Sequence, residues 1–329
     1  MSIAKFMILA GDIGGTKTLI GLFEPDMPRP RPLAVRAFAT LEFGDLPSML
    51  SIFVNDASPK GAVIESACFG VAGPIVGDTA QLTNVGWRVD ARQVASAWGL
   101  KRVWLLNDLE AMACGVSVLH ESEVHTLQKG EASGTGNIAV IAAGTGLGQA
   151  LLHNVGGRLV PSPSEAGHAD FAARTERDIA LLRDLVARHG RAAVEDVVSG
   201  PGLANIHRMT HGAASCDADI DLGQADAPAA ISRAALDRRC RGCVDALELF
   251  VEAYGAEAGN LALRAVATGG VYVGGGIALK ILPALTSGAF MKAFRAKPPF
   301  EPMLDKIPVK VILNAEVGLL GAAVFAAAS

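Results

Sequence analysis

Charge, cysteine and long apolar runs are all scarce in this sequence of 329 residues, and each shortage excludes a class of protein. The net charge is only −4 and no run of five like charges occurs, so the sequence lacks the basic footprint of a protein that binds nucleic acid or anionic membranes. No segment reaches the roughly 18 uninterrupted apolar residues that a membrane-spanning helix needs. We therefore expect a soluble protein whose partners are small molecules.

The five cysteines are an odd number in a long chain and make no disulfide framework, which favours a reducing, cytoplasmic environment. Cys240 and Cys243 form a C-x-x-C pair, which could be a redox motif or half of a zinc site. No second cysteine pair accompanies it in the sequence. We therefore expect neither a metal nor a redox role at these two residues.

The composition that remains, with 50% hydrophobic and 19% charged residues, is typical of a well-packed protein long enough for two domains. Residues 5–12 predict a strand rather than a secretory signal, because no small-residue cleavage site follows them. After a Gly-Gly-Thr turn, residues 18–24 alternate back as a second strand. Strand and helix patterns then alternate along the chain, which predicts an α/β fold.

One pattern occurs twice. GDIGGTKTLIGLF near the start and AAGTGLGQALLHN in the second half both place a Gly-Thr turn between two apolar strands. Such a repeat indicates an internal duplication that produced two similar domains facing each other. Glycine-tipped hairpins can also resemble one another by chance.

Three glycine-rich turns are candidate nucleotide sites. In residues 12–18, glycines let backbone N–H groups approach phosphate oxygens, and the Asp12 carboxylate can act on a metal-bound water. This is neither a Walker loop nor a dinucleotide fingerprint, because both lead from a strand into a helix. Residues 144–148 can bind phosphate from the opposite side, and residues 273–277 leave room for adenine or ribose. Each segment could also be an ordinary turn.

Asn107 and Asp108 close the apolar strand VWLLND. A carboxylate at a strand end beside a phosphate site can accept the proton of an attacking hydroxyl, which makes Asp108 the candidate general base. The pair would otherwise be explained by turn formation, for which Asn and Asp are common residues.

Glu165 and His168, with Glu195 further along, offer carboxylate and imidazole groups that match adjacent sugar hydroxyls. His168 could instead be a structural hydrogen-bond donor or the start of a zinc site. The residues ADFAARTERD that follow it contain no cysteine, so we favour a hydroxyl ligand.

These motifs closely resemble the bacterial glucokinase family, within the larger fold of actin, hexokinases and heat-shock chaperone ATPases. The resemblance runs from Ala10 to the C-terminal helix. LAGDIGGTKT and AAGTGLGQA resemble the family's two phosphate loops, LLNDLEA its catalytic turn, CFGVAGPI with Gly73 its sugar-side loop, and LTNVGW the turn that follows. SEAGHADFA and EDVVSGPGLANIH complete the sugar site by the same similarity.

The resemblance implies an ATP-dependent kinase that converts glucose to glucose 6-phosphate, with Asp108 abstracting the 6-hydroxyl proton. It implies two actin/hexokinase-like (ribonuclease H-like) α/β domains flanking a central cleft, one at 1–109 completed by a helix at 315–329, the other at 110–314. Glucose would be bound by Gly73, Asn107, Asp108, Glu165, His168 and Glu195. ATP would be bound by Gly11, Asp12, Ile13, Gly14, Gly15, Thr16, Gly144, Thr145, Gly146 and Gly275.

The same resemblance implies a homodimer and Mg²⁺ held mainly by ATP, with Asp12 acting through water. A kinase for mannose, fructose or an N-acetylhexosamine is the nearest alternative, because the motifs separate these sugars poorly. A sugar-sensing repressor would need a helix-turn-helix module, and only about ten residues precede Asp12. The repressor and sugar-kinase group carries a cysteine-rich zinc motif after Glu-x-Gly-His, which this chain lacks, so the zinc-free branch is the better match. Residues 213–228 match no motif.

Overall fold

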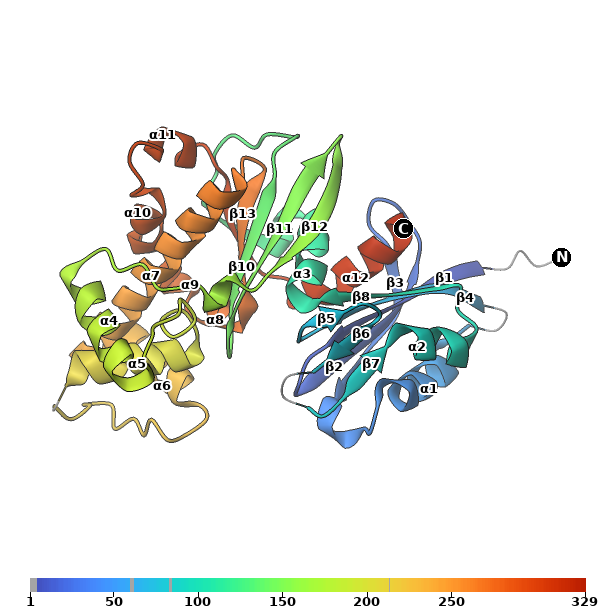
Figure 1. Ribbon diagram of the computed structural model, residues 1–329, viewed down its shortest axis with the longest axis horizontal. Helices are drawn as coiled ribbons and strands as arrows, with labels where there is room; N and C mark the ends of the chain where they lie inside the picture. The colour runs from blue at the N-terminus through green and yellow to red at the C-terminus, as the bar shows by residue number, and fades with distance from the viewer. Residues whose placement is uncertain (1–4, 60–61, 83–84, 213) are drawn as a thin grey trace. The chain divides into compact units, whose positions relative to one another are not determined.

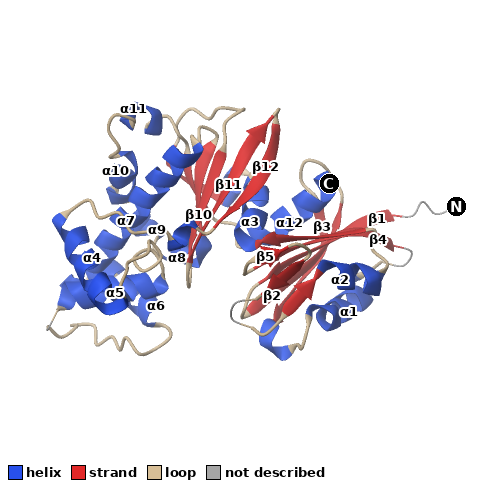
Figure 2. Cartoon of the chain, viewed as in Figure 1, coloured by secondary structure: helices blue, strands red, loops and turns tan. Residues whose placement is uncertain are grey.

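The structure is a computed structural model that describes residues 5–59, 62–82, 85–212 and 214–329. The chain divides into two compact units, one made of Met1–His120 with Asn314–Ser329 and the other of Glu121–Leu313. Each unit is built on a main β-sheet with helices against it (Figures 1 and 2). Among the described residues, no helix is both long and apolar enough to cross a membrane.

The first unit contains a five-stranded sheet in the order β3-β2-β1-β4-β8. Helices α1 and α2 lie on one face of this sheet, and α3 and α12 lie on the other (Figure 1). A three-stranded sheet, β5-β6-β7, completes the unit. The bounds are β1 Lys5–Ile13, β2 Lys17–Glu24, β3 Arg31–Ala39, η1 Thr40–Glu42, α1 Leu46–Ala57, β4 Ala62–Val71, β5 Ile75–Val76, β6 Thr79–Gln81, β7 Arg88–Asp90, α2 Ala91–Trp98, β8 Arg102–Asn107, α3 Asp108–Val116 and α12 Val317–Ala328.

The second unit contains a six-stranded sheet in the order β12-β11-β10-β13-β14-β9. The long helix α7 packs on β10 and β13 and against α5, α6 and α10 (Figure 1). The bounds are η2 Glu121–Glu123, β9 Val124–Gln128, β10 Ile138–Ala143, β11 Leu147–Val155, β12 Arg158–Ser164, η3 Ala166–His168, α4 Glu176–His189, α5 Gly200–His211, α6 Ala227–Leu236, α7 Arg241–Ala265, β13 Gly270–Gly274, α8 Gly275–Lys280, α9 Leu282–Leu285, α10 Ala289–Arg295, α11 Glu301–Leu304 and β14 Val309–Ile312.

The two main sheets repeat one topology, as the duplicated sequence pattern predicts. In each, three antiparallel strands (β3-β2-β1 and β12-β11-β10) are followed by two parallel ones (β4-β8 and β13-β14), and β9 is added only to the second sheet. Parallel strands require crossovers, and helices provide them, so chain segments that join sheet to helix gather at the carboxyl ends of the parallel strands.

The first unit extends beyond the expected border after residue 109 and reaches His120. The reason is that α3 packs closely against α12. A Cβ at Gly115 or Gly321 would collide with the backbone of the other helix, at Val317 and Ala111 respectively. The small residues of the C-terminal helix therefore allow the two helix backbones to touch, and α3 remains with the unit that α12 completes.

Candidate functional site

The β1–β2 hairpin forms the first glycine-rich turn. Its strands pair down to Ile13 and Thr18, and the N–H of Gly14 donates to the carbonyl of Lys17 at 3.1 Å. The Thr40 hydroxyl donates to the carbonyl of Gly14 at 2.8 Å and holds the turn from the side. Thr16 lies exposed at the tip, so backbone groups there are accessible to a phosphate.

The residues before the turn serve it differently. Gly11 and Ile13 are buried, and a Cβ at Gly11 would lie 2.6 Å from the Phe69 ring, so Gly11 permits close packing within the sheet. Asp12 lies on β1 just ahead of the turn. Burial raises the pKa of Asp12 to about 6, although the nearby charge of Lys17 lowers it in part. A carboxylate with this pKa is a poised oxygen donor beside the turn.

The structure brings Asn107, Asp108 and Gly73 together at the end of β8. The Asn107 side chain caps α3 by accepting from the N–H of Leu109 at 2.9 Å, and it donates to the carbonyl of Gly73 at 3.4 Å. Glu110 completes the capping box by accepting from the N–H of Asn107 at 3.1 Å.

Asp108 is the first residue of α3, where its carboxylate also accepts from the N–H of Leu109 at 2.9 Å. A helix N-terminus favours negative charge, which suits a carboxylate that acts as a base. The cap of Asn107 fixes the direction of the turn, and that direction fixes where the Asp108 carboxylate lies.

In the second unit, the β10–β11 turn joins the other predicted sugar residues. The Glu195 carboxylate accepts from the N–H of Leu147 at 2.8 Å, and a Cβ at Gly146 would lie 2.6 Å from its Oε2 atom. Gly146 is thus the residue that admits Glu195. The side chain of Glu195 is 30% exposed, so it is held by the turn and still reaches solvent.

His168 and Glu165 lie in the same group as Glu195. The N–H of His168 donates to the carbonyl of Glu165 at 3.0 Å within η3, and the N–H of Glu195 donates to the carbonyl of Gly167 at 2.9 Å. His168 Nδ1 lies 3.9 Å from Glu195 Oε1, and the histidine side chain is 62% exposed. An imidazole and a carboxylate therefore lie side by side with access to solvent, and Glu165 precedes them in the same turn, an arrangement that suits a polyhydroxylated ligand.

A pocket of about 680 Å³ lies within the second unit. Gly144 and Thr145 line it, together with the N-terminus of α5, residues 224–229 and Gly276. The N–H of Gly200 donates to the carbonyl of Gly144 at 2.8 Å, so the α5 N-terminus is fixed against the glycine turn. The volume of the pocket suits a nucleotide-sized ligand, and a helix N-terminus is a favourable place for phosphate.

Gly275 is the residue expected to bind the nucleotide, but it is the next residue, Gly276, that lines the pocket. Gly275 has φ +85° and packs against the carbonyl of Ala143, whereas Gly276 lines the pocket. Tyr254 fixes this junction, because its buried hydroxyl accepts from the N–H of Ala143 at 3.1 Å and lies 3.2 Å from the carbonyl of Gly274.

The sequence places the start of α5 in the sugar site and indicates no role for α6 or for the connection between the two helices, although all three line this pocket. The connection carries no recognised motif, and only the fold brings it to the glycine turn. Thr83 and Asn84, in the predicted turn LTNVGW, lie outside the described residues.

Comparisons with known proteins show the family to which this chain belongs. The glucokinase family model matches residues 9–329. A glucokinase from Nostoc punctiforme is 40% identical over 339 aligned residues, which cover 98% of this chain and 99% of that protein. This chain belongs to the glucokinase family.

Solved structures of other glucokinase family members share its fold. The crystal structure of a glucokinase from an Antarctic psychrotroph is 30% identical, with a TM-score of 0.88 over 98% of this chain and 99% of that one. A ROK family glucokinase from Streptomyces griseus, solved with glucose and AMPPNP, is 23% identical with a TM-score of 0.67, over 98% and 100% of the two chains. The expected actin/hexokinase-like α/β fold is confirmed by these neighbours.

Proposed function

We propose that this chain is a glucokinase, which transfers the terminal phosphate of ATP to the 6-hydroxyl of D-glucose. The observation that carries the proposal is the position of Asp108. It is the first residue of α3, and the Asn107 cap fixes the start of this helix. Asp108 is the general base that accepts the hydroxyl proton as the oxygen attacks phosphorus. The protein forms no covalent bond to the phosphate in this mechanism, so positioning of the substrates and stabilisation of charge supply most of the rate enhancement.

Glucose is the acceptor that the polar groups suit. One set of hydrogen-bonding groups consists of Asn107, Asp108 and the Gly73 carbonyl. A second set consists of Glu165, His168 and Glu195. Carboxylates accept hydrogen bonds from sugar hydroxyls and an imidazole can accept or donate one, and such groups discriminate strongly against analogues that lack a hydroxyl.

ATP is the phosphate donor in this proposal. The exposed tips of the two turns, at Thr16 and at Thr145, offer backbone groups to phosphate oxygens, and the pocket beside Gly276 takes the nucleoside. The related Streptomyces griseus structure holds the ATP analogue AMPPNP together with glucose, which supports the choice of nucleotide.

The Asp12 carboxylate fits Mg²⁺, because it is a hard oxygen donor placed next to the first phosphate turn. The ion would be held mainly by ATP phosphates and water, and when bound it would neutralise phosphate charge. Asp12 would bind through water on the protein side of the ion. We place the enzyme in the cytoplasm, as a homodimer acting in glycolysis.

The test is ADP release by the purified chain with ATP, Mg²⁺ and a panel of glucose, mannose, fructose and N-acetylglucosamine. Glucose-dependent turnover is expected, with the highest kcat/KM for glucose. Turnover with another hexose alone would retain the kinase and replace the sugar. No turnover with any hexose, in protein that still binds ATP, would contradict the proposed reaction.

A further inference from the structure

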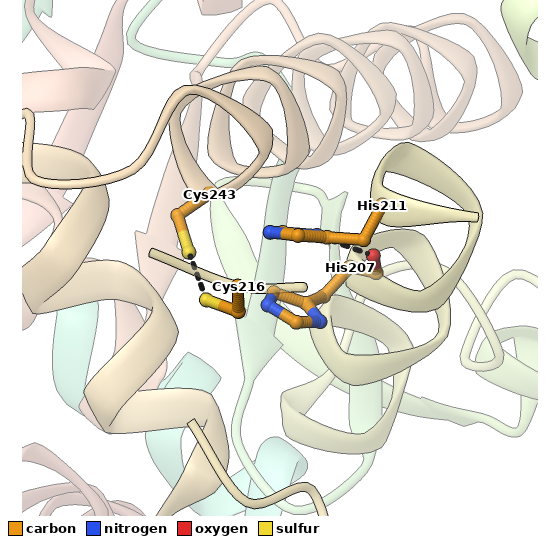
Figure 3. Close-up of side chains that lie close together, drawn as sticks. All are labelled: His207, His211, Cys216 and Cys243. Carbon is orange, nitrogen blue, oxygen red and sulfur yellow. Dashed lines mark hydrogen bonds between the residues drawn. The ribbon is translucent and has the colours of Figure 1, made fainter. Parts of the chain in front are cut away.

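The end of α5, the connection that follows it and the start of α7 bring together nitrogen and sulfur side chains that the proposed function does not use. His207 and His211 lie one helical turn apart on α5, and Cys216 follows in the connection. The ligand atoms of these three residues and Cys243 all lie within 4.8 Å of one another (Figure 3). The sequence shows no second cysteine pair to accompany Cys240 and Cys243. In the structure, a third cysteine and two histidines lie beside them.

The sulfur atoms have the spacing of a metal centre. Cys216 Sγ lies 3.7 Å from Cys243 Sγ and 3.8 Å from Cys240 Sγ. A tetrahedral ion with zinc–sulfur bonds of about 2.3 Å places its sulfur ligands about 3.8 Å apart. The measured separations are those of thiolates around one Zn²⁺, and they are too long for sulfur–sulfur bonds.

His211 is oriented for the same centre. Its Nδ1 atom lies 2.9 Å from the carbonyl oxygen of His207, and because a carbonyl only accepts, Nδ1 carries the proton. Nε2 is then the unprotonated nitrogen, and it lies 3.2 Å from Cys240 Sγ. A backbone carbonyl that fixes the tautomer of a histidine in this way is the usual partner of a zinc ligand.

His207 is a second, independent sign of a missing partner. Its side chain is 4% exposed, and both ring nitrogens are buried without a hydrogen-bond partner. The ring stacks on that of His211, with 3.8 Å between centroids. Burying an imidazole with no partner for either nitrogen is costly, and this cost arises at the edge of the same cluster.

The start of α7 favours negative charge at this place. Cys240 is the N-cap residue of α7, a helix of 25 residues, and Cys243 lies in its first turn. Three thiolates around a divalent cation leave one net negative charge, which the N-terminus of α7 stabilises.

We propose that Cys216, Cys240, Cys243 and His211 bind one structural Zn²⁺. The ring of His207 stacks on that of His211 and packs beside the four ligands without binding the ion. The site is separate from the Glu-x-Gly-His segment, where the related repressor and sugar-kinase group carries its cysteine-rich motif. The ion would link the end of α5 to the start of α7. Cys216 lies in the connection between α5 and α6, and later residues of that connection, 224–226, line the 680 Å³ pocket.

The first experiment measures zinc in the full-length chain, purified without a polyhistidine tag from zinc-supplemented medium. Elemental analysis should give about one zinc per chain. Cys216→Ser, Cys243→Ser and Cys240→Ser should each lower the zinc content at least tenfold. The matched controls Cys68→Ser and Cys114→Ser remove buried cysteines of the first unit and should leave it unchanged.

Replacement of zinc by Co²⁺ in the unmutated protein gives a readout that does not depend on whether the variants fold. An intense thiolate-to-cobalt band with tetrahedral ligand-field absorption is expected. Zinc should be lost in His211→Phe and retained in His207→Phe; the reverse result would overturn the assignment of His211. A zinc content near zero with no cobalt band, or a disulfide among the three cysteines after purification under reducing conditions, would overturn the site.

Discussion

The carboxylate of Asp12 lies against the first turn of α12, so closely that a Cβ on Gly318 would be 2.8 Å from Oδ2. α12 begins at Val317, and the N–H groups of a first helical turn have no partners within the helix. A helix from the C-terminus thus packs on the residue that precedes the first phosphate turn. Packing of α12 against Asp12 also keeps water from the carboxylate, and this desolvation raises its pKa.

The stability of the unliganded protein should depend on pH through Asp12. Its pKa rises from the ordinary 3.8 to about 6, chiefly because of burial, so the neutral acid favours folding at low pH. That contribution is lost as the pH rises through about 6. Asp12→Asn, which cannot ionise, should therefore gain stability relative to the unmutated protein between pH 4.5 and pH 7.5.

Urea unfolding at several pH values measures this difference, and Asp26→Asn, which removes an exposed carboxylate of the same unit, is the control. A stability difference between Asp12→Asn and the unmutated protein that stays constant over this pH range would contradict the raised pKa.

Replacement of the proposed base should remove turnover and leave the fold intact. Asp108→Asn is expected to lower kcat by ~10²–10⁴-fold, because a general base typically contributes that much. Asp90→Asn is the matched control, since Asp90 caps α2 in the same unit and asparagine caps a helix equally well. Near-normal kcat in Asp108→Asn would remove Asp108 from the catalytic role.

Glu195 should matter for sugar binding rather than for nucleotide binding. Glu195→Gln keeps the shape and the contact with the Leu147 N–H but loses the charge. We expect the KM for glucose to rise about tenfold or more, the usual worth of a hydrogen bond to a charged group, with the KM for ATP little changed. Glu176→Gln, on the exposed first turn of α4, serves as control. An unchanged glucose KM in Glu195→Gln would exclude the residue from the sugar site.

Filling the pocket beside α8 should interfere with ATP. A Cβ on Gly276 meets no atom within 4 Å, and its φ is not in the left-handed region, so Gly276→Phe can fold and project into the pocket. The KM for ATP should rise at least tenfold, equivalent to about 1.4 kcal/mol. Gly134→Phe, also in open space but away from the pocket, should have no such effect. Equal ATP KM values for the two variants would place the nucleoside elsewhere.

The contact between α3 and α12 should be intolerant of even one methyl group. Gly321→Ala would force its Cβ into the carbonyl of Ala111, and separating the helices should cost about 1–3 kcal/mol of unfolding free energy. Gly86→Ala is the control, because Gly86 is exposed and its Cβ position is open. Chemical denaturation compares the two, and equal midpoints would show that the helices can move apart without cost.

Much of the fold and part of the site could be predicted from sequence because the signals are local. Glycine-tipped hairpins, the strand ending at Asn107 and the C-terminal helix each depend on neighbouring residues, and the β1–β2 and β10–β11 pairs confirm the hairpins. The positions of Asn107 and Asp108 are also local, because Asn107 caps the N-terminus of α3 and Asp108 is its first residue. Such features are fixed by backbone sterics and short-range hydrogen bonds, which a few consecutive residues specify.

Contacts between distant segments were decided only by the tertiary structure. The sequence left Cys240 and Cys243 without companions, and it gave no role to residues 213–228. Packing of α5, α6 and α7 then brings Cys216 and His211 to the cysteine pair and brings residues 224–229 to the Gly144 turn. Which side chains meet across 20 or 30 residues depends on how whole helices pack, and the spacing of residues along the chain carries no record of that.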